Sequence, residues 1–182
     1  MFPLVGLIGI QLMATPDETA DDIFQASGKL RLDTIQESTA EVLRESVRYA
    51  RSTRWDSVRS PHLFMGLLAA PDIGINCWGD RLGADLPRLL DQFAELFHQE
   101  DGECETYLCL NREFFSDNVI RLLREAYHRA AEHGRRVTPI DLLISLFTTP
   151  NSIVAECFER IGVTAARLTE LAVKAEQQAE KG

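Results

Sequence analysis

The sequence predicts an all-α protein built from two copies of a four-helix unit, with about eight helices in all. An apolar stretch at residues 59–68 has a counterpart at residues 137–147, about eighty positions later. Similar helical patterns flank both stretches in the same order, which indicates an internal duplication. No segment of any length alternates apolar and polar residues as a strand does. We therefore expect two units related by an approximate two-fold axis.

Each apolar stretch is predicted to be the central helix of its unit. A hydroxyl residue followed by proline begins each one, as Ser60-Pro61 and as Thr138-Pro139. Serine and threonine commonly cap helix starts, and proline is tolerated in the first helical turn. A helix that is apolar almost all round must be buried. We expect the following leucines at the centre of the protein: Leu63, Leu67, Leu142 and Leu146.

The remaining helices follow from periodicity and from helix-ending residues. In the first copy we expect helices from about residue 33 to 52, from 76 to 82 and from 86 to 99. The second copy begins at the helix cap Ser116 and repeats the plan to about residue 180. A stripe spaced by three and four residues precedes each central helix, with small side chains where another helix must come close. The stripes are Leu43, Ser46 and Ala50 in one copy and Leu123, Ala126 and Ala130 in the other.

These elements divide the chain into four parts. Residues 1–30 form an apolar arm and an acidic segment, 31–100 the first repeat, 101–114 a linker and 115–182 the second repeat. The apolar run Met1 to Met13 is too short to span a membrane. It has the length of a signal-peptide core, but no Lys or Arg precedes it. We expect it instead to cover apolar surface on its own domain or on a second copy in a homodimer.

Charge and cysteine usage exclude several classes of partner. A net charge of −9 argues against nucleic acid as the main partner, since phosphate binding needs a basic surface. The four cysteines lack the paired spacing of a zinc site. Cys77 and Cys157 fall in apolar helical stretches, and glutamates flank Cys104, so a reducing, cytoplasmic location fits best.

The sequence offers no catalytic constellation. It lacks the Gly-x-x-x-x-Gly-Lys-Ser/Thr phosphate loop, so this chain is not an ATP motor by itself. His128 and Glu132 share a helix face, but no third metal ligand accompanies them. His62 could serve as a general base, but no candidate nucleophile lies at a spacing in the sequence that would place it beside this histidine. We predict no catalytic, cofactor-binding or metal-binding residue.

The ordered copies resemble the Clp N-terminal repeat, the double four-helix module that precedes the AAA+ rings of Clp unfoldases and disaggregases. In the first copy the resemblance is carried by Leu43, Ala50, His62, Leu63, Gly66, Leu67 and Leu82-Gly83. In the second it is carried by Leu123, Ala126, Ala130, Gly134, Leu142, Leu143, Leu146 and the run from Ile153 to Gly162. It covers about residues 32 to 175 and implies an all-α fold and a protein-binding role.

The sequence departs from the family at a position that bears on ligands. Where the family often has a glutamate, tied in some members to binding phosphorylated arginine, this chain has Pro61 and Ile140. A guanidinium ligand needs carboxylate partners, so we expect only weak binding of phosphoarginine. Gly79 also stands where the family usually has a large apolar residue.

The resemblance implies a non-catalytic module that recruits substrate polypeptides or adaptors to a Clp-type AAA+ unfoldase or protease. An accessory subunit that stabilises or regulates a Clp protease assembly is the alternative, and an enzyme is the least favoured. The turns before the two central helices carry the candidate protein-binding residues, because a tryptophan flanked by arginines is typical of interaction hot spots. These candidates are Arg54, Trp55, Arg59, Arg135 and Arg136. The alternative is that Trp55 folds back over the first helix and the arginines complement nearby acidic residues.

Overall fold

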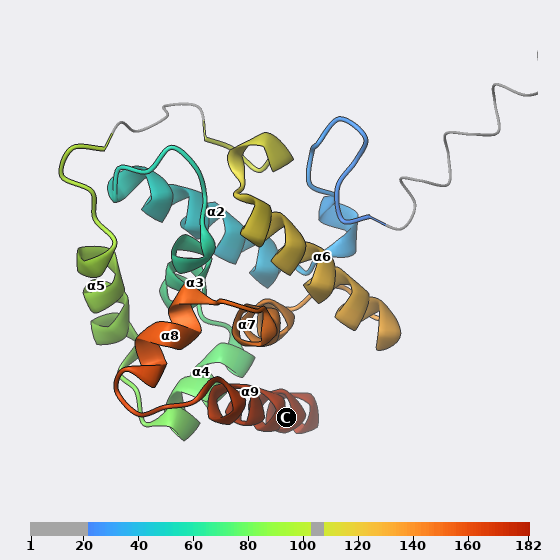
Figure 1. The fold of residues 1–182 in the computed structure, drawn as a ribbon. Helices are drawn as coiled ribbons and strands as arrows, with labels where there is room; N and C mark the ends of the chain where they lie inside the picture. The colour runs from blue at the N-terminus through green and yellow to red at the C-terminus, as the bar shows by residue number, and fades with distance from the viewer. Residues whose placement is uncertain (1–21, 103–107) are drawn as a thin grey trace, which may run out of the picture.

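The computed structural model describes residues 22–102 and 108–182, and its regular structure in both ranges is helical. The first copy contributes η2 (Leu32–Thr34), α2 (Glu37–Ser52), α3 (Ser60–Ala69), α4 (Ile73–Leu82) and α5 (Leu86–Leu96). The second contributes η3 (Arg112–Phe114), α6 (Asp117–Glu132), α7 (Pro139–Thr148), α8 (Ile153–Glu159) and α9 (Ala165–Lys181). Here η denotes a short 3-10 helix. Figure 1 shows α7 near the middle of the molecule, with α4 and α9 side by side below it.

Two reciprocal backbone bridges confirm the predicted two-fold relation between the copies. Residue 35, which follows η2, pairs with residue 137 before α7, and residue 115, which follows η3, pairs with residue 58 before α3. Each bridge uses two hydrogen bonds. Those of the first join Gln36 N to Val137 O (3.0 Å) and Val137 N to Thr34 O (2.9 Å). In each copy, the residues just before the first long helix therefore pair with the residues just before the central helix of the other copy.

Three helix starts differ from the prediction. The helix expected from residue 76 begins at Ile73, because the side chain of Asp72 caps it by accepting from the N–H of Ile75 at 2.9 Å, and the helix expected to reach residue 99 ends at Leu96. The first long helix begins at Glu37 rather than at Asp33, because η2 and the bridge to Val137 occupy the preceding residues. Thr138 caps α7 as predicted, but Ser60 is the first residue of α3 and not its cap. In α3 the cap position is Arg59, whose backbone N–H donates to Nδ1 of His62 at 3.0 Å. The prediction that Ser60 caps this helix was wrong because the helix starts one residue earlier: the N–H groups of His62 and Leu63 donate to the carbonyl of Arg59, at 3.0 and 3.1 Å.

The central helices α3 and α7 are buried as predicted. The exposed fraction is 0% for all four leucines that were expected at the centre: Leu63, Leu67, Leu142 and Leu146. Glycine at position 66 lets α3 approach α2 closely, since a Cβ atom there would lie 2.4 Å from the carbonyl oxygen of Val42. In the second copy Ser145 and Ala126 occupy the places of Gly66 and Ser46. Small side chains thus meet at both helix pairs.

An aromatic cluster fills the centre of the seam between the copies. Phe64 of α3 lies within 4.8 to 6.3 Å, centroid to centroid, of four other rings from both copies. These rings are Trp78, Phe93, Phe147 and Phe158. The indole N–H of Trp78 also donates to the carbonyl of Leu168 in α9 at 3.2 Å. Because this part of the seam is solid core, ligand contacts must lie at its edges.

The following helix explains why residue 79 is a glycine where the family usually has a large apolar residue. A Cβ atom there would lie 2.8 Å from a methyl group of Leu86, so Leu86 fills the space that a larger residue at position 79 would need. The space is therefore filled from α5 instead of from α4.

Part of the N-terminal segment packs on the domain. Ile23, Phe24 and Leu30 are buried in the core, and Asp22 forms an ion pair with Arg124 of α6 at 3.0 Å. The arm from Met1 to Met13 and the predicted homodimer through it lie outside the described residues, as does Cys104. No helix in the ranges 22–102 and 108–182 is long and apolar enough to cross a membrane.

Candidate protein-binding site

The turn between α2 and α3 holds Arg54 in a left-handed conformation. Its φ angle is +67°, whereas the equivalent position of the second copy is Gly134, with φ of +64°. Glycine adopts this region freely, but another residue is strained there. The Arg54 guanidinium reaches the carbonyl of Glu100 at 2.5 Å, which offsets part of this strain. The first copy therefore keeps a charged side chain at a position where glycine would fit better.

Trp55 lies half-buried beside the start of α3. Its indole N–H donates to the carbonyl of Phe97 at 2.6 Å. Its ring makes an edge contact with His62, with centroids 5.6 Å apart, and the guanidinium carbon of Arg59 lies 4.7 Å from the ring centroid. This cation–π contact leaves Arg59 exposed, with only a distant carboxylate, Asp56, at 3.9 Å.

A hollow of about 120 Å³ opens next to this tryptophan, and we call it the Trp55 pocket. Its apolar lining comes from four residues on separate elements: Trp55, Pro61, Phe97 and Ile153. Ile153 begins α8 and is 46% exposed, which is unusual for so large an apolar side chain. The pocket therefore combines an apolar lining with one available cation, Arg59.

The floor of the Trp55 pocket includes the buried, neutral histidine His62, which is 1% exposed. Burial, together with the smaller effect of the nearby charge of Arg59, lowers the pKa of His62 to about 4. Since Nδ1 accepts from the Arg59 backbone, Nε2 carries the proton and donates to the hydroxyl of Thr53 at 3.1 Å. That hydroxyl in turn donates to the carbonyl of Tyr49 at 2.6 Å. Both ring nitrogens are engaged, so His62 serves to fix the turn.

The second copy has an equivalent hollow, which we call the Arg135 pocket. It has a volume of about 270 Å³, and its lining includes Ile73, Arg135, Ile140 and Glu176. The equivalence follows from the duplication, because Ile73 begins α4 as Ile153 begins α8, and Arg135 replaces Trp55 in the turn. The two pockets share no lining residue. They are separate sites at equivalent places of the two copies.

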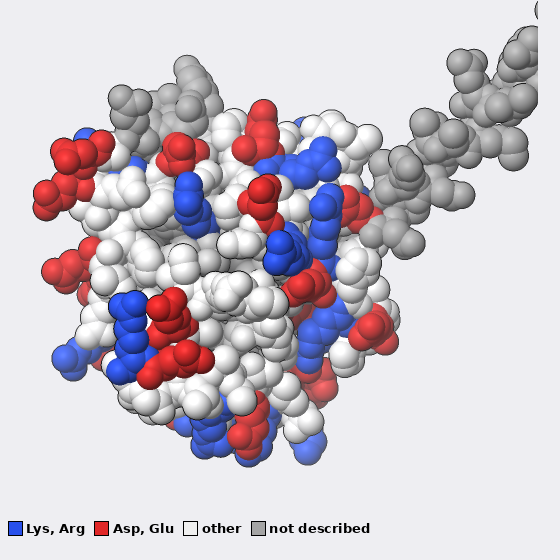
Figure 2. All heavy atoms as spheres, viewed as in Figure 1, with Lys and Arg blue, Asp and Glu red and all other residues white. Residues whose placement is uncertain are grey.

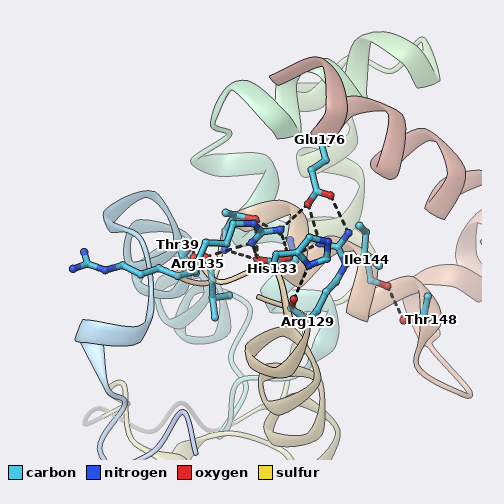
Figure 3. A network of polar contacts seen from close by, with 11 residues as sticks. Thr39, Arg129, His133, Arg135, Ile144, Thr148 and Glu176 are labelled. Atoms are coloured by element: carbon cyan, nitrogen blue, oxygen red, sulfur yellow. Dashed lines mark hydrogen bonds and ion pairs between the residues drawn. The ribbon is translucent and has the colours of Figure 1, made fainter. Parts of the chain in front are cut away.

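Arg135 is held by an ion-pair network that also includes Arg129, Asp141 and Glu176 (Figure 3). Asp141 takes the place of His62 at the start of the central helix and is 0% exposed. Glu176 reaches down from α9 to Arg129 at 2.8 Å and to Arg135 at 3.0 Å. Two arginines and two carboxylates balance in charge, and the network ties α6 and α7 to α9.

The lowered pKa of Asp141 indicates that the ion-pair network stabilises the charged form of this carboxyl group. Burial alone would raise the pKa of this carboxyl group, but hydrogen bonds from Arg135, the backbone of Thr138 and Arg129 outweigh it and lower the pKa below the usual range. The same network raises the pKa of Arg129, chiefly through its hydrogen bonds with Glu176 and against the effect of burial. Asp141, Arg129 and Arg135 are therefore charged at neutral pH.

The structure thus brings three of the five candidate residues together and separates the other two. Arg54, Trp55 and Arg59 share the turn before α3, where Trp55 and Arg59 line the Trp55 pocket. Arg135 lies in the other pocket within its ion pairs, and Arg136 beside it is exposed.

Sequence reasoning missed Phe97 and Ile153 of the Trp55 pocket and Glu176 of the network. These side chains arrive from other helices, and only the duplication itself could have indicated their places. Among the described residues no three His, Cys, Asp or Glu side chains gather as a metal site would require.

The architecture is that of a duplicated all-α module, and comparison with known proteins identifies its fold. No protein-family model matches the sequence. No curated protein matches it either. Solved structures do match, and the fold is that of the Clp N-terminal domain.

Two similar structures illustrate the match. One is the N-terminal domain of the caseinolytic protease associated chaperone ClpD from Arabidopsis thaliana, with a TM-score of 0.63 and 17% identity, covering 82% of this chain and 99% of that domain. The other comes from structural investigations of a malarial protein secretion system, with a TM-score of 0.61 and 16% identity, covering 79% of this chain and 96% of that one. At these identities the likeness concerns the fold, and the predicted resemblance is confirmed at that level.

Proposed function

We propose that this protein is a non-catalytic binding module that recruits substrate polypeptides or adaptors to a Clp-type AAA+ unfoldase or protease. The observation that carries the proposal is the Trp55 pocket, an apolar hollow with an available cation on a fold shared with the N-terminal domain of a Clp chaperone. Apolar pockets with a few polar groups are the common form of binding site. We place this activity in cytoplasmic protein quality control.

In this proposal Trp55 is the apolar anchor and Arg59 guides the approach of partners. An aromatic residue beside an arginine is the usual composition of an interaction hot spot. On a protein of net charge −9, exposed arginines steer flexible or acidic segments toward the pocket. Arg54 adds charge at the same turn. Arg135 and Arg136 contribute a second, weaker contact at the Arg135 pocket.

Binding of a fluorescein-labelled, permanently unfolded polypeptide, followed by fluorescence anisotropy, tests the proposal. We expect Trp55→Ala combined with Arg59→Ala to weaken binding at least about tenfold, which corresponds to about 1.4 kcal/mol. The matched control replaces an exposed leucine and an exposed arginine outside the pocket, Leu32→Ala with Arg121→Ala, and should bind as the wild type does. Melting curves for both variants establish that each remains folded. Equal binding by the two double variants would place the contact surface elsewhere.

A second candidate function is an accessory subunit that stabilises or regulates a Clp protease assembly. The observation that favours it is the Arg135 pocket, which gives the protein a second contact surface with Ile73 72% exposed at its rim. Affinity purification of the tagged protein distinguishes the two functions. Co-purification with a AAA+ ring and client proteins supports recruitment, whereas co-purification with peptidase rings alone supports assembly.

A further inference from the structure

We propose that the Trp55 pocket is one end of a longer groove that binds an extended polypeptide segment carrying an apolar anchor and, about three to five residues away, a basic residue. This inference rests on the proposed function and specifies its partner. Two observations support it: hollows lie in a row along α8, and the charge of the side chains changes from positive at the Trp55 end to negative at the other end.

Three adjoining hollows follow one another along the start of α8, and we call them together the α8 groove. The Trp55 pocket shares Ser60 and Asn118 with a small middle hollow. The middle hollow shares Thr149, Asn151 and Ser152 with a third hollow of about 450 Å³. Neighbouring hollows share lining residues and therefore adjoin, although the middle hollow is shallow, with a volume of about 10 Å³.

One face of α8 forms a wall of this groove. Ile153 lines the Trp55 pocket, while Glu156 and Glu159 line the third hollow. Residues three apart lie on the same side of a helix, so these three side chains form one stripe. The stripe begins with an exposed apolar residue and continues with two acids, so the chemistry of the groove changes along its length.

The two ends of the α8 groove carry side chains of opposite charge, and both are free enough to pair with a bound segment. At one end, the exposed Arg59 has its closest carboxylate at 3.9 Å. At the other end, Glu159 is exposed, and Glu156 makes only a surface ion pair with Arg160 at 3.1 Å, in which both side chains are more than half exposed. Surface pairs of this kind exchange readily for another partner. A basic residue of a bound segment is repelled by Arg59 and attracted by the glutamates, which fixes how the segment lies.

The middle hollow is too small to hold a polypeptide backbone, so a bound chain crosses over its polar rim. Its lining carries hydroxyl and amide groups from Ser60, Asn118, Asn151 and Ser152, which can pair with backbone N–H and C=O groups of an extended chain. Figure 2 shows that uncharged side chains predominate in the centre of the face that carries α8, with charged groups around them. Contacts of this kind do not depend on sequence, as recruitment of varied clients requires.

The length of α8 sets the spacing of the recognised residues. From Ile153 to Glu159 the helix rises about 9 Å, at about 1.5 Å per residue. An extended chain advances about 3.3 Å per residue, so this distance corresponds to about three residues, and to about five when the reach of the side chains is included. The segment is therefore short enough to lie within one unfolded or linker stretch of a client.

The test uses three fluorescein-labelled peptides with a Leu-Phe anchor, a Gly-Ser spacer and a last pair of residues that is Lys-Lys, Ser-Ser or Glu-Glu, each made in both chain directions. We expect wild-type protein to bind the Lys-Lys peptide about fivefold more tightly than the Ser-Ser peptide in one direction, and the Glu-Glu peptide more weakly than either. Raising the salt concentration should reduce this preference. Glu156→Gln with Glu159→Gln should abolish the preference for the Lys-Lys peptide over the Ser-Ser peptide.

The matched control removes the same charge from exposed glutamates outside the groove, Glu113→Gln with Glu132→Gln, and should keep the preference. If no peptide binds, the proposed function itself fails. If all peptides bind equally and Trp55→Ala weakens them all, the proposed function stands and the groove inference is refuted. A preference for the Glu-Glu peptide, or a loss of the Lys-Lys preference in the control variant as well, would also overturn the inference.

Discussion

Protonation of His62 should destabilise this protein at mildly acidic pH. The imidazole is 1% exposed and its pKa is lowered to about 4, mainly by burial. In the unfolded chain a histidine has a pKa of about 6.5. Between these two values the unfolded state binds the additional proton, so the free energy of unfolding must fall as the pH falls. The contribution is fully present above about pH 6.5 and is lost as the pH approaches 4.

The size of this effect follows from the two pKa values. The full difference of about 2.5 units corresponds to about 3 kcal/mol, at 1.36 kcal/mol per unit. Between pH 7 and pH 5 the linkage relation gives a loss of about 2 kcal/mol from this histidine alone. Asp22 and Asp141, whose pKa values are lowered, act mainly below this range. Burial raises the pKa of Asp72, which acts in the opposite direction, so the contribution of His62 is measured against a variant that lacks it.

Urea unfolding at a series of pH values from 7 to 5, followed by circular dichroism, measures the loss. The comparison is with His62→Gln, because glutamine at this position can still accept the N–H of Arg59, as in a capping box, but does not titrate. We expect the wild type to lose about 2 kcal/mol more than the variant over this range. Parallel pH dependences for the two proteins would refute the assignment of a buried neutral His62.

Four substitutions test the packing and the network in the same unfolding assay. Asp141→Ala should lower the free energy of unfolding by about 3–5 kcal/mol, because it leaves two partly buried arginines with one carboxylate, whereas the exposed Glu132→Ala should change it by less than about 0.5 kcal/mol. Gly66→Ala should lower it by about 1–3 kcal/mol, since the new Cβ atom would clash with the α2 backbone. Leu146→Ala should lower it by about 2–5 kcal/mol, and an unchanged melting temperature would contradict the central position of α7. Arg54→Gly should not destabilise the protein, because it removes left-handed strain; a loss above about 1 kcal/mol would contradict that reading of the turn.

The sequence was sufficient to predict the elements whose signals are local. Thr138 and Ser116 cap their helices through their own side chains, and each signal lies within a few residues of the helix start. The small residues before the central helices, such as Ser46 and Ala126, are buried as their spacing indicated. The duplication strengthened each of these predictions, because the same feature occurs at the equivalent position of both copies.

The features that could not be predicted depend on distant partners. For Arg135 the sequence left open docking and pairing with acidic residues; Glu176, 41 positions later, and Asp141 hold it in an ion-pair network. The Trp55 pocket likewise includes Ile153, which periodicity alone does not place beside the first copy. In each case the missing information is which helices meet, and that is decided by packing across the seam.

The crossed bridges between the copies have a consequence for the folding unit. Residues 34–36 pair with Val137, and residues 114–116 pair with Val58, so each half supplies hydrogen-bond partners that the other half needs. A fragment containing one copy would leave these backbone groups without partners and would expose aromatic side chains that pack between the copies, such as Phe64 against Phe147 and Phe158. A chain cut in the linker should therefore give two fragments that fold only on mixing. A protein with a single copy would have to form a symmetric dimer to make the same bonds, so the duplicated chain is in effect such a dimer joined covalently.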